Sequence, residues 1–304
     1  MSLHVFASFV TPFGTAANNR AETEGNITTL QKLLWMGNTH STVSAEAIRF
    51  ALRRRLATCE SNGTNRRWDE TERVNGWEDP DFAGWASEKS KTYIDDDLLG
   101  FMKAEAAKEE GESGSADVRR AVLEVTRAIS LTPWPGDVTF NAASPGATPS
   151  AQKKGSNPVP YGTELHATRY QYGIALTPER LRDKSRAAKA IEALCNLGTV
   201  AGNHGRFLFD FSPDAVVFRI TSDPAPRLLY CFATDDDGRT VKAPALVQRI
   251  RAGDIAADEL IAGVGDLDSP LAAELKSAGV KVCGVKAACA AAVTRVDGSL
   301  KTKD

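Results

Sequence analysis

Short apolar runs separated by proline, glycine and aspartate set the pattern of this chain. Several runs are continuously apolar or alternate between apolar and polar residues, which is the pattern of strands. The predicted strands cover residues 4–10, 163–176, 207–211, 215–220, 227–234 and 280–285, with a further extended piece at 138–140. Residues 28–34 fit either a short strand or a helical turn. Residues 118–129 have strand character, although a helix also fits.

Helical spacing of apolar residues begins at two capping positions. Ser44 is the predicted N-cap of a helix that extends to about Arg55, with Glu46 in its first turn and arginines in its last turn, as the helix dipole favours. A second helix is predicted from residue 177 to about residue 197. The remaining predicted helices cover residues 242–262 and 268–278.

Three segments lack such patterns. Residues 16–26 and 37–41 are polar and are predicted as loops. Residues 141–160 are rich in Pro, Gly, Ser and Ala, so they are predicted to form a flexible excursion between two strands, which makes a long hairpin with Lys153 and Lys154 near its tip.

Residues 60–117 differ in character from their surroundings. They hold three tryptophans and many acids, and we interpret them as an insertion with some packed aromatic side chains. Outside this insertion, strands that are separated along the chain are interspersed with helices. This order predicts an α+β fold with an antiparallel sheet and helices on one face.

Length and composition fit a globular protein. The 304 residues are compatible with two domains or one elaborated domain. Hydrophobic residues make up 42% and charged residues 25%, which excludes collagen, coiled coil and wholesale disorder. No apolar stretch is long enough for a transmembrane helix, and residues 1–14 do not resemble a signal peptide, so a cytoplasmic location and no membrane partner are expected.

Charge is segregated along the chain, although the total is only −2. Residues 1–67 carry a net charge of +4 and residues 118–219 carry +5, whereas residues 68–117 carry −10 and the remainder −1. A basic face built from the first and third segments would attract phosphates, because local charge decides this and not the total. The alternative is a solvated surface with an acidic insertion.

The usual enzyme signatures are absent from the sequence. The five cysteines are scattered without a CxxC pair, which is typical of reduced thiols and not of disulfides or structural zinc. The four histidines do not have metal-site spacing, and no phosphate-loop or nucleophile-elbow motif occurs. The run Asp95, Asp96 and Asp97 fits either a cation site or, more commonly, a turn or helix cap. No metal and no cofactor are expected.

Three polar segments suit an anionic backbone, because glycines allow close approach, helix N-termini offer free N–H groups and arginine supplies a forked donor. They comprise Asn18, Asn19 and Arg20; His40, Ser41 and Ser44 with Arg49 and Arg53 on the following helix; and Gly202, Asn203, His204, Gly205 and Arg206. Each has a structural alternative: an Asx turn at Asn18, an exposed helix residue at Arg49 and a buried, satisfied ring at His204. His40 and His204 could also form an acid–base pair.

Five blocks in order resemble the DevR-type backbone subunits of type I CRISPR Cascade, which belong to the Cas-seven superfamily and are most familiar from type I-B systems. The first block runs from TPFG at 11–14 through NNRAETEGN to GNTHSTVSAEAIRFALR at 37–53. The others are YIDDDLLGFM at 93–102, RAISLTPWPGD at 127–137, TELHATRYQYGIAL at 163–176 and AGNHGRFLFDFSPDAVVFRIT at 201–221. Residues 222–304 contain no comparable block.

The resemblance implies an RRM-like (ferredoxin-like) palm of residues 1–59, 118–137 and 166–304, with a finger insertion at 60–117 and a thumb hairpin at 138–165. It implies a non-catalytic subunit that polymerises along a CRISPR guide RNA (crRNA) as a helical filament for antiviral target recognition. Its partners would be the guide RNA, the target DNA strand paired to it, copies of itself and other Cascade subunits. Sequence would then be read by base pairing and not by the protein.

The resemblance assigns contacts with the guide RNA to all the residues named above in the three polar segments. Phe140, Lys153 and Lys154 are assigned to the thumb. Related type III subunits cut RNA with an acid in the loop before the first helix, and residues 40–43 here contain none.

Two other functions compete with this interpretation. One is a metal-dependent or histidine-based ribonuclease on a related fold. The other is a DNA-binding autoregulator, a role attached to the family name, although no helix-turn-helix pattern supports it.

Overall fold

The computed structural model describes residues 2–18, 22–87, 90–105, 115–147, 152, 157–202, 204–235 and 237–302. In these ranges no helix is long and apolar enough to cross a membrane. The predicted class is confirmed, because helices and mainly antiparallel sheets are mixed along the chain.

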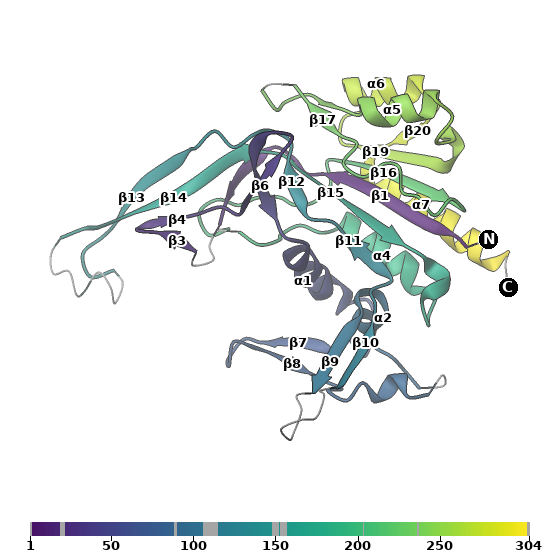
Figure 1. The fold of residues 1–304 in the computed structure, drawn as a ribbon, viewed down its shortest axis with the longest axis horizontal. Coiled ribbons are helices and arrows are strands. Elements are labelled where there is room, and N and C mark those ends of the chain that lie inside the picture. Colours follow the sequence, from purple (N-terminus) through teal and green to yellow (C-terminus); the bar gives the residue numbers. More distant parts are fainter. Residues whose placement is uncertain are drawn as a thin grey trace.

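A nine-stranded sheet is the largest sheet in the described part of the chain (Figure 1). Its strands in order are β20 (Lys281–Cys283), β19 (Leu260–Val264), β16 (Ala215–Thr221), β1 (His4–Val10), β15 (Tyr170–Leu176), β12 (Ala128–Ser130), β6 (Asn38–Val43) and β5 (Lys32–Trp35), and β11 (Leu123–Val125) also pairs with β15. The pairs are antiparallel except for β19 and β20. In the centre, Ala7 lies opposite both Ile174 and Phe218.

Helices cover both faces of this sheet. The helices are α1 (Ala45–Leu56), α2 (Ile94–Leu99), α4 (Arg186–Cys195), α5 (Pro244–Arg251), α6 (Pro270–Ser277) and α7 (Val285–Lys301), with short 3-10 turns η1 (Ala83–Trp85), η2 (Pro178–Arg180) and η3 (Ala257–Glu259). Successive strand residues point to opposite faces. Accordingly, Val5 and Phe9 of β1 join an apolar cluster with α1, α4 and α7, whereas Phe6 and Val10 join a second cluster with α5 and α6.

The prediction of helices on one face is therefore wrong. Figure 1 shows α5 and α6 above β19, across the sheet from α4. The second cluster contains Leu246 of α5 and Leu271 and Leu275 of α6, and all three are buried. The C-terminal part thus supplies the second face, which residues 1–221 alone would leave open.

The predicted long hairpin is confirmed as an arm that extends away from the sheet (Figure 1). Strands β13 (Val138–Ala143) and β14 (Val159–Thr168) pair in an antiparallel register from Val138 opposite Glu164 to Ala143 opposite Val159. Near its base, β14 also pairs with β2 (Gly14–Ala17) and β4 (Ile27–Thr28), and β4 pairs with β3 (Thr23–Glu24). Residues 16–26, predicted as a loop, therefore contribute strands to the arm.

The described residues of 60–93 and 101–119 form a second projection below α1 and α2 (Figure 1). It contains two hairpins, which are β7 (Arg66–Asp69) with β8 (Val74–Trp77) and β9 (Phe101–Glu105) with β10 (Ser115–Arg119). The packed aromatics predicted here are confirmed. The Phe82 and Phe101 rings stack at 3.8 Å, and Trp77 meets Phe82 edge to face at 5.3 Å.

Several predicted elements are wrong because local backbone features interrupt them. The strand predicted at 227–234 is reduced to β17 (Ala233–Thr234), which pairs with β18 (Val241–Lys242), since Arg227 and Tyr230 have positive φ angles of 56° and 54°. Residues 207–211 form no strand, and Phe209 and Phe211 instead pack against Tyr170.

The boundaries of several other elements differ from those predicted from the sequence. Residues 37–41 belong mostly to β6, and 118–129 divide among β10, β11 and β12. The helix expected from 177 starts at Arg186, after the turn η2. Residues 28–34 are extended at both ends, in β4 and β5. The segment 242–262 contains α5, η3 and the start of β19, and α7 was not predicted.

Candidate nucleic-acid interface

Helix α1 is built as its sequence predicts. Ser44 has extended backbone angles, and its hydroxyl oxygen accepts a hydrogen bond from Ala47 N at 3.2 Å, so it is an N-cap. Ile48 and Leu52 are fully buried against the sheet. The polar side of α1 is thereby presented toward the second projection.

Arg49 and Arg53, both predicted guide contacts, are used to hold α1 to α2. The Arg49 guanidinium donates to Leu99 O, and Arg53 Nε donates to Asp95 Oδ2 at 3.0 Å. Burial, followed by the charge of Arg53, lowers the pKa of Arg49. Both arginines are half-buried, and one guanidinium nitrogen of each donates inside the protein, so they stabilise the contact of α1 with α2. Their assignment to the guide stays a prediction.

The exposed arginines of α1 are the next two in sequence, Arg54 and Arg55. In the part of the chain that the structure describes, neither has an acidic partner. Arg54 lies one turn after Phe50, whose ring meets the 41%-exposed Trp68 of β7 edge to face at 6.5 Å. The sequence did show four arginines here, but the helix spacing alone did not tell which two face α2.

His40 and Ser41 lie in β6 and are buried in a polar network, so they are not the surface residues that their predicted guide contact requires. His40 Nδ1 lies 2.7 Å from Ser130 O. The Ser41 hydroxyl lies 2.6 Å from His166 Nδ1 and 2.7 Å from Tyr170 Oη. Burial lowers the pKa of His166 to about 4, so this ring is neutral at pH 7. The network satisfies buried polar groups that β6 brings into the interior.

The 201–206 turn lies against β2 at the base of the arm. A Cβ added to Gly202 would lie 3.3 Å from Ala17 O, and Asn18 next to it donates from Nδ2 to Thr29 O at 3.1 Å. The His204 ring is held at both nitrogens, by Val200 O and Phe209 N. The His204 ring is thus satisfied, as in the structural alternative, but it is half-buried and not buried.

Arg206 is the exposed cation of this turn. Its guanidinium lies over the Tyr161 ring of β14 at 4.8 Å, which fixes it at the arm, and Gly205 beside it is exposed. On the opposite strand of the arm, the Phe140 side chain is 81% exposed. The predicted contacts Asn19, Arg20, Asn203, Lys153 and Lys154 lie outside the described residues.

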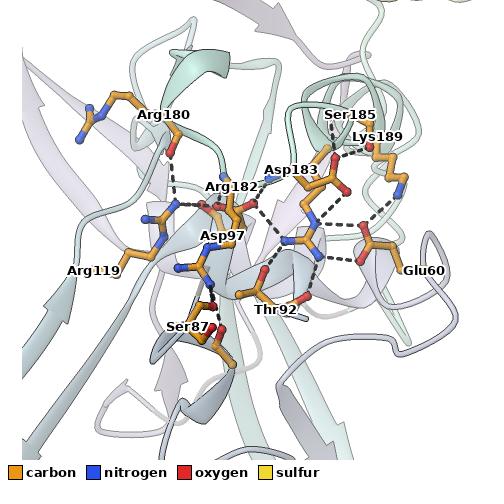
Figure 2. A network of polar contacts seen from close by, with 12 residues as sticks. Glu60, Ser87, Thr92, Asp97, Arg119, Arg180, Arg182, Asp183, Ser185 and Lys189 are labelled. Carbon is orange, nitrogen blue, oxygen red and sulfur yellow. Dashed lines mark hydrogen bonds and ion pairs between the residues drawn. The ribbon is translucent and has the colours of Figure 1, made fainter. Parts of the chain in front are cut away.

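A charged junction fixes the second projection to the body (Figure 2). Asp97, fully buried, accepts from Arg119 Nη2 at 2.6 Å and from the backbone N–H groups of Arg182 and Asp183 at 3.0 and 3.1 Å. It also accepts at 3.0 Å from Arg186, which forms a two-pronged pair with Glu60 at 3.0 and 2.9 Å. These contacts occupy the backbone donors of 182 and 183, consistent with α4 starting only at Arg186.

The triple aspartate is therefore a helix-terminus cluster with protein partners. Asp95, Asp96 and Asp97 fill the first turn of α2. Asp95 accepts from the backbone N–H groups of Asn65 and Arg66, and Asp96 accepts from Asn65 Nδ2 at 2.9 Å. Among the described residues no group of three or more His, Cys, Asp and Glu side chains could hold a metal ion.

Asp96→Asn is expected to change the pH dependence of stability. Burial, together with the charge of Asp95, raises the pKa of Asp96 to about 7. Between the unfolded pKa near 4 and pH 7, the folded chain holds a proton that the unfolded chain has released, so this group costs stability as pH rises. Urea unfolding should give equal stabilities near pH 4 and a variant more stable by on the order of 2 kcal/mol at pH 8. A constant difference across that range would contradict the assignment.

Comparisons with known proteins point in one direction. A family model described as DevR, CRISPR-associated negative auto-regulator DevR/Csa2, matches residues 11–229. A protein of Myxococcus xanthus (strain DK1622) described as CRISPR-associated protein Cas7/Cst2/DevR is 63% identical over 301 residues, which is 98% of this chain and 99% of that protein.

Solved structures share the fold at low sequence identity. A chain of a CRISPR RNA-guided surveillance complex matches with a TM-score of 0.55 and 15% identity, covering 95% of this chain and 99% of that chain. A chain of such a complex described as pre-nicking matches with a TM-score of 0.54 and 12% identity, covering 95% and 100%. The similarity therefore extends beyond residue 229, into the part that carries α5 to α7.

Proposed function

Because this chain belongs to the DevR/Csa2 family of CRISPR-associated proteins, we propose that it binds a CRISPR guide RNA as a repeated backbone subunit of a type I Cascade surveillance complex. One observation carries the proposal for this chain. Arg54, Arg55 and Arg206 are exposed and, among the described residues, have no carboxylate partner. Two exposed or half-exposed aromatic side chains accompany them, Trp68 near α1 and Tyr161 under Arg206. Free guanidinium groups beside aromatic rings suit a single strand of RNA.

The fold supports a palm, finger and thumb division of the subunit. Strands β16, β1, β15 and β11 are adjacent in that order, and α1 and α4 pack on one face. This order supports the proposal of an RRM-like palm. We assign residues 1–59, 118–137 and 166–304 to the palm. The projection at 60–117 would be the finger, and the arm at 138–165 would be the thumb with Phe140 on its surface.

The subunit would act without catalysis. His40 and Ser41 are buried and His204 is held at both ring nitrogens, so these groups serve the fold. The guide would be gripped by its backbone while its bases pair with the target DNA strand. Copies of the chain and other Cascade subunits would complete the complex in antiviral defence.

Coexpression with a CRISPR array tests the proposal. The purified protein should have a high ratio of absorbance at 260 nm to that at 280 nm, and extraction should yield RNA of uniform length. A protein-only spectrum from a monomeric peak, even after coexpression with the partner subunits, would overturn it.

The two pairs of arginines on α1 are expected to respond differently to substitution. Arg54→Ala with Arg55→Ala should weaken guide binding by roughly threefold to tenfold and reduce the salt dependence, because two phosphate contacts to a single strand are lost. The melting temperature should not change. Arg49→Ala with Arg53→Ala should lower the melting temperature, because Asp95 loses its cation. Filter binding at several salt concentrations and thermal unfolding measure these effects, and the reverse pattern would contradict the structural assignment.

A further inference from the structure

The second projection contains a pocket that the proposed guide contacts do not use. It has a volume of about 480 Å³, which is in the usual range for small-ligand sites. It lies where η1, β9 and β10 meet the turn η2. Figure 1 shows β9 and β10 below α2, well apart from the arm.

One side of this pocket is apolar and aromatic. Phe82, Trp85 and Phe101 line it, with the Phe82 and Phe101 rings stacked and the Trp85 ring 6.0 Å from Phe101. Val118 on β10 adds a 55%-exposed aliphatic surface. Phe82 and Phe101 are only 5% and 9% exposed. The Trp85 ring is already contacted by the guanidinium groups of Arg119 at 4.1 Å and Arg182 at 4.3 Å. This side therefore offers ring edges and Val118 to an apolar part of a ligand.

The other side is cationic. Arg119, Arg120 and Arg180 line the pocket, and the Arg119 guanidinium lies 4.1 Å from the centre of the Trp85 ring. Arg120 and Arg180 are exposed, and in the described part of the chain their side chains have no acidic partner. Figure 2 shows the Arg180 side chain pointing away from the junction. The carboxylate that also lines the pocket, Asp81, is paired with Lys103 at 2.9 Å.

One donor in the pocket walls, Arg119 Nε, is buried without an acceptor, whereas the Trp85 indole N–H is directed to the Asp96 carboxylate. Buried donors in native proteins are nearly always paired, with a bound ion or water where protein groups do not suffice. Arginine and indole N–H groups are donors only. An occupant that satisfies this lining has to supply acceptors and negative charge to the arginines and an apolar body to the aromatic side.

We propose that this pocket binds a nucleotide unit, with its phosphate at Arg120 and Arg180 and its base toward the Phe82, Trp85 and Phe101 side. Arginine forks match phosphate oxygens, and an apolar wall with few polar groups is the usual lining around the planar part of a ligand. The nucleotide could belong to a nucleic-acid strand or be a free mononucleotide, since the chemistry is shared. The site is separate from Arg54, Arg55 and Arg206, so it stands independently of the proposed guide surface.

Tryptophan fluorescence of the full chain provides a local test. Titration with 5′-AMP should change the emission of the wild type, and Trp85→Phe should abolish that change. Arg120→Ala with Arg180→Ala should weaken AMP binding at least tenfold, because about 1.4 kcal/mol or more of charge-assisted hydrogen bonding is lost. Both arginines are exposed, so far-UV circular dichroism should be unaltered. The matched control is Arg239→Ala with Arg251→Ala, two exposed arginines outside the pocket.

Two further probes identify the ligand. Inorganic phosphate should bind at least tenfold more weakly than AMP, and equal affinities would overturn the assignment of a base site. A five-nucleotide oligomer that binds more tightly than AMP and is weakened by the same double variant would identify a strand; if only AMP responds, the ligand is a free nucleotide. No Trp85-dependent change with AMP or the oligomer, or the same affinities without Arg120 and Arg180, would overturn the proposal.

Discussion

Replacing Asp97 with alanine is expected to lower the free energy of unfolding by about 3–5 kcal/mol, because removal of one partner from a buried ion pair leaves the other charge uncompensated. Arg186 is only 3% exposed, and its Nη1 donates to Asp97. The substitution also leaves Arg119 without its carboxylate and the N–H groups of residues 182 and 183 without an acceptor. Urea unfolding followed by circular dichroism measures the loss.

Two further variants make this result interpretable. Asp97→Asn keeps the side chain's size and removes its charge, so a loss close to that of alanine would assign the effect to charge. Asp81→Ala removes a carboxylate that is 77% exposed and paired with Lys103, and it should cost at most about 1 kcal/mol. If Asp97→Ala costs no more than Asp81→Ala, the junction does not hold the projection to the body.

In this junction the acidic residues could be recognised from the sequence, whereas their partners could not. The run of three aspartates at 95–97 allowed a turn or helix cap or a cation site. The acids lie in the first turn of α2, as the helix dipole favours, but the N-cap is Tyr93 and their side chains accept from other segments instead of capping the helix. Which cations oppose the acids was not predictable, because Arg119 and Arg186 come from segments 22 and 89 residues away. Ion pairs between residues far apart in the sequence depend on the topology of the fold, which the local sequence pattern does not show.

In the candidate interface, too, some features were predictable from local sequence rules and others were not. The N-cap at Ser44 and the hairpin around 138–168 follow from local rules, and both were predicted. His40 and Ser41 look like loop residues because β6 has little apolar pattern, yet they are buried by hydrogen bonding to Ser130, His166 and Tyr170. A strand that buries polar groups against other polar groups has no hydrophobic signature.

Helix α7 and strand β19 explain why the C-terminal part was the least predictable. Strand β19 is buried at every position, so the period of 2 that marks a half-buried strand is absent from it. The buried residues of α7 do follow a helical spacing, at 288, 292, 296 and 300, so this helix had a signal in the sequence that was not recognised. The segment 260–264 is buried at every position, and its first three residues were included in the helix predicted at 242–262. Only its pairing with β16 and β20 decides that it is a strand.

Arg206→Glu is expected to lower guide RNA binding by about tenfold to a hundredfold, the equivalent of one or two charge-assisted hydrogen bonds lost and a repulsion gained. Arg206 is exposed and lies over the Tyr161 ring, so the fold should be unaffected. One measurement is the amount of RNA that copurifies with the protein. A second is the affinity for a labelled guide RNA after the copurified RNA has been removed.

Control variants separate charge, stacking and general electrostatics at this site. Arg251→Glu makes the same charge change at an exposed position on α5, and it should leave binding within about twofold if the effect is local. Tyr161→Ala should reproduce a smaller part of the loss, because the guanidinium loses the ring that orients it, while Tyr161→Phe should bind as the wild type does. Equal losses for Arg206→Glu and Arg251→Glu would mean that net charge, and not the 201–206 turn at the base of the arm, holds the guide.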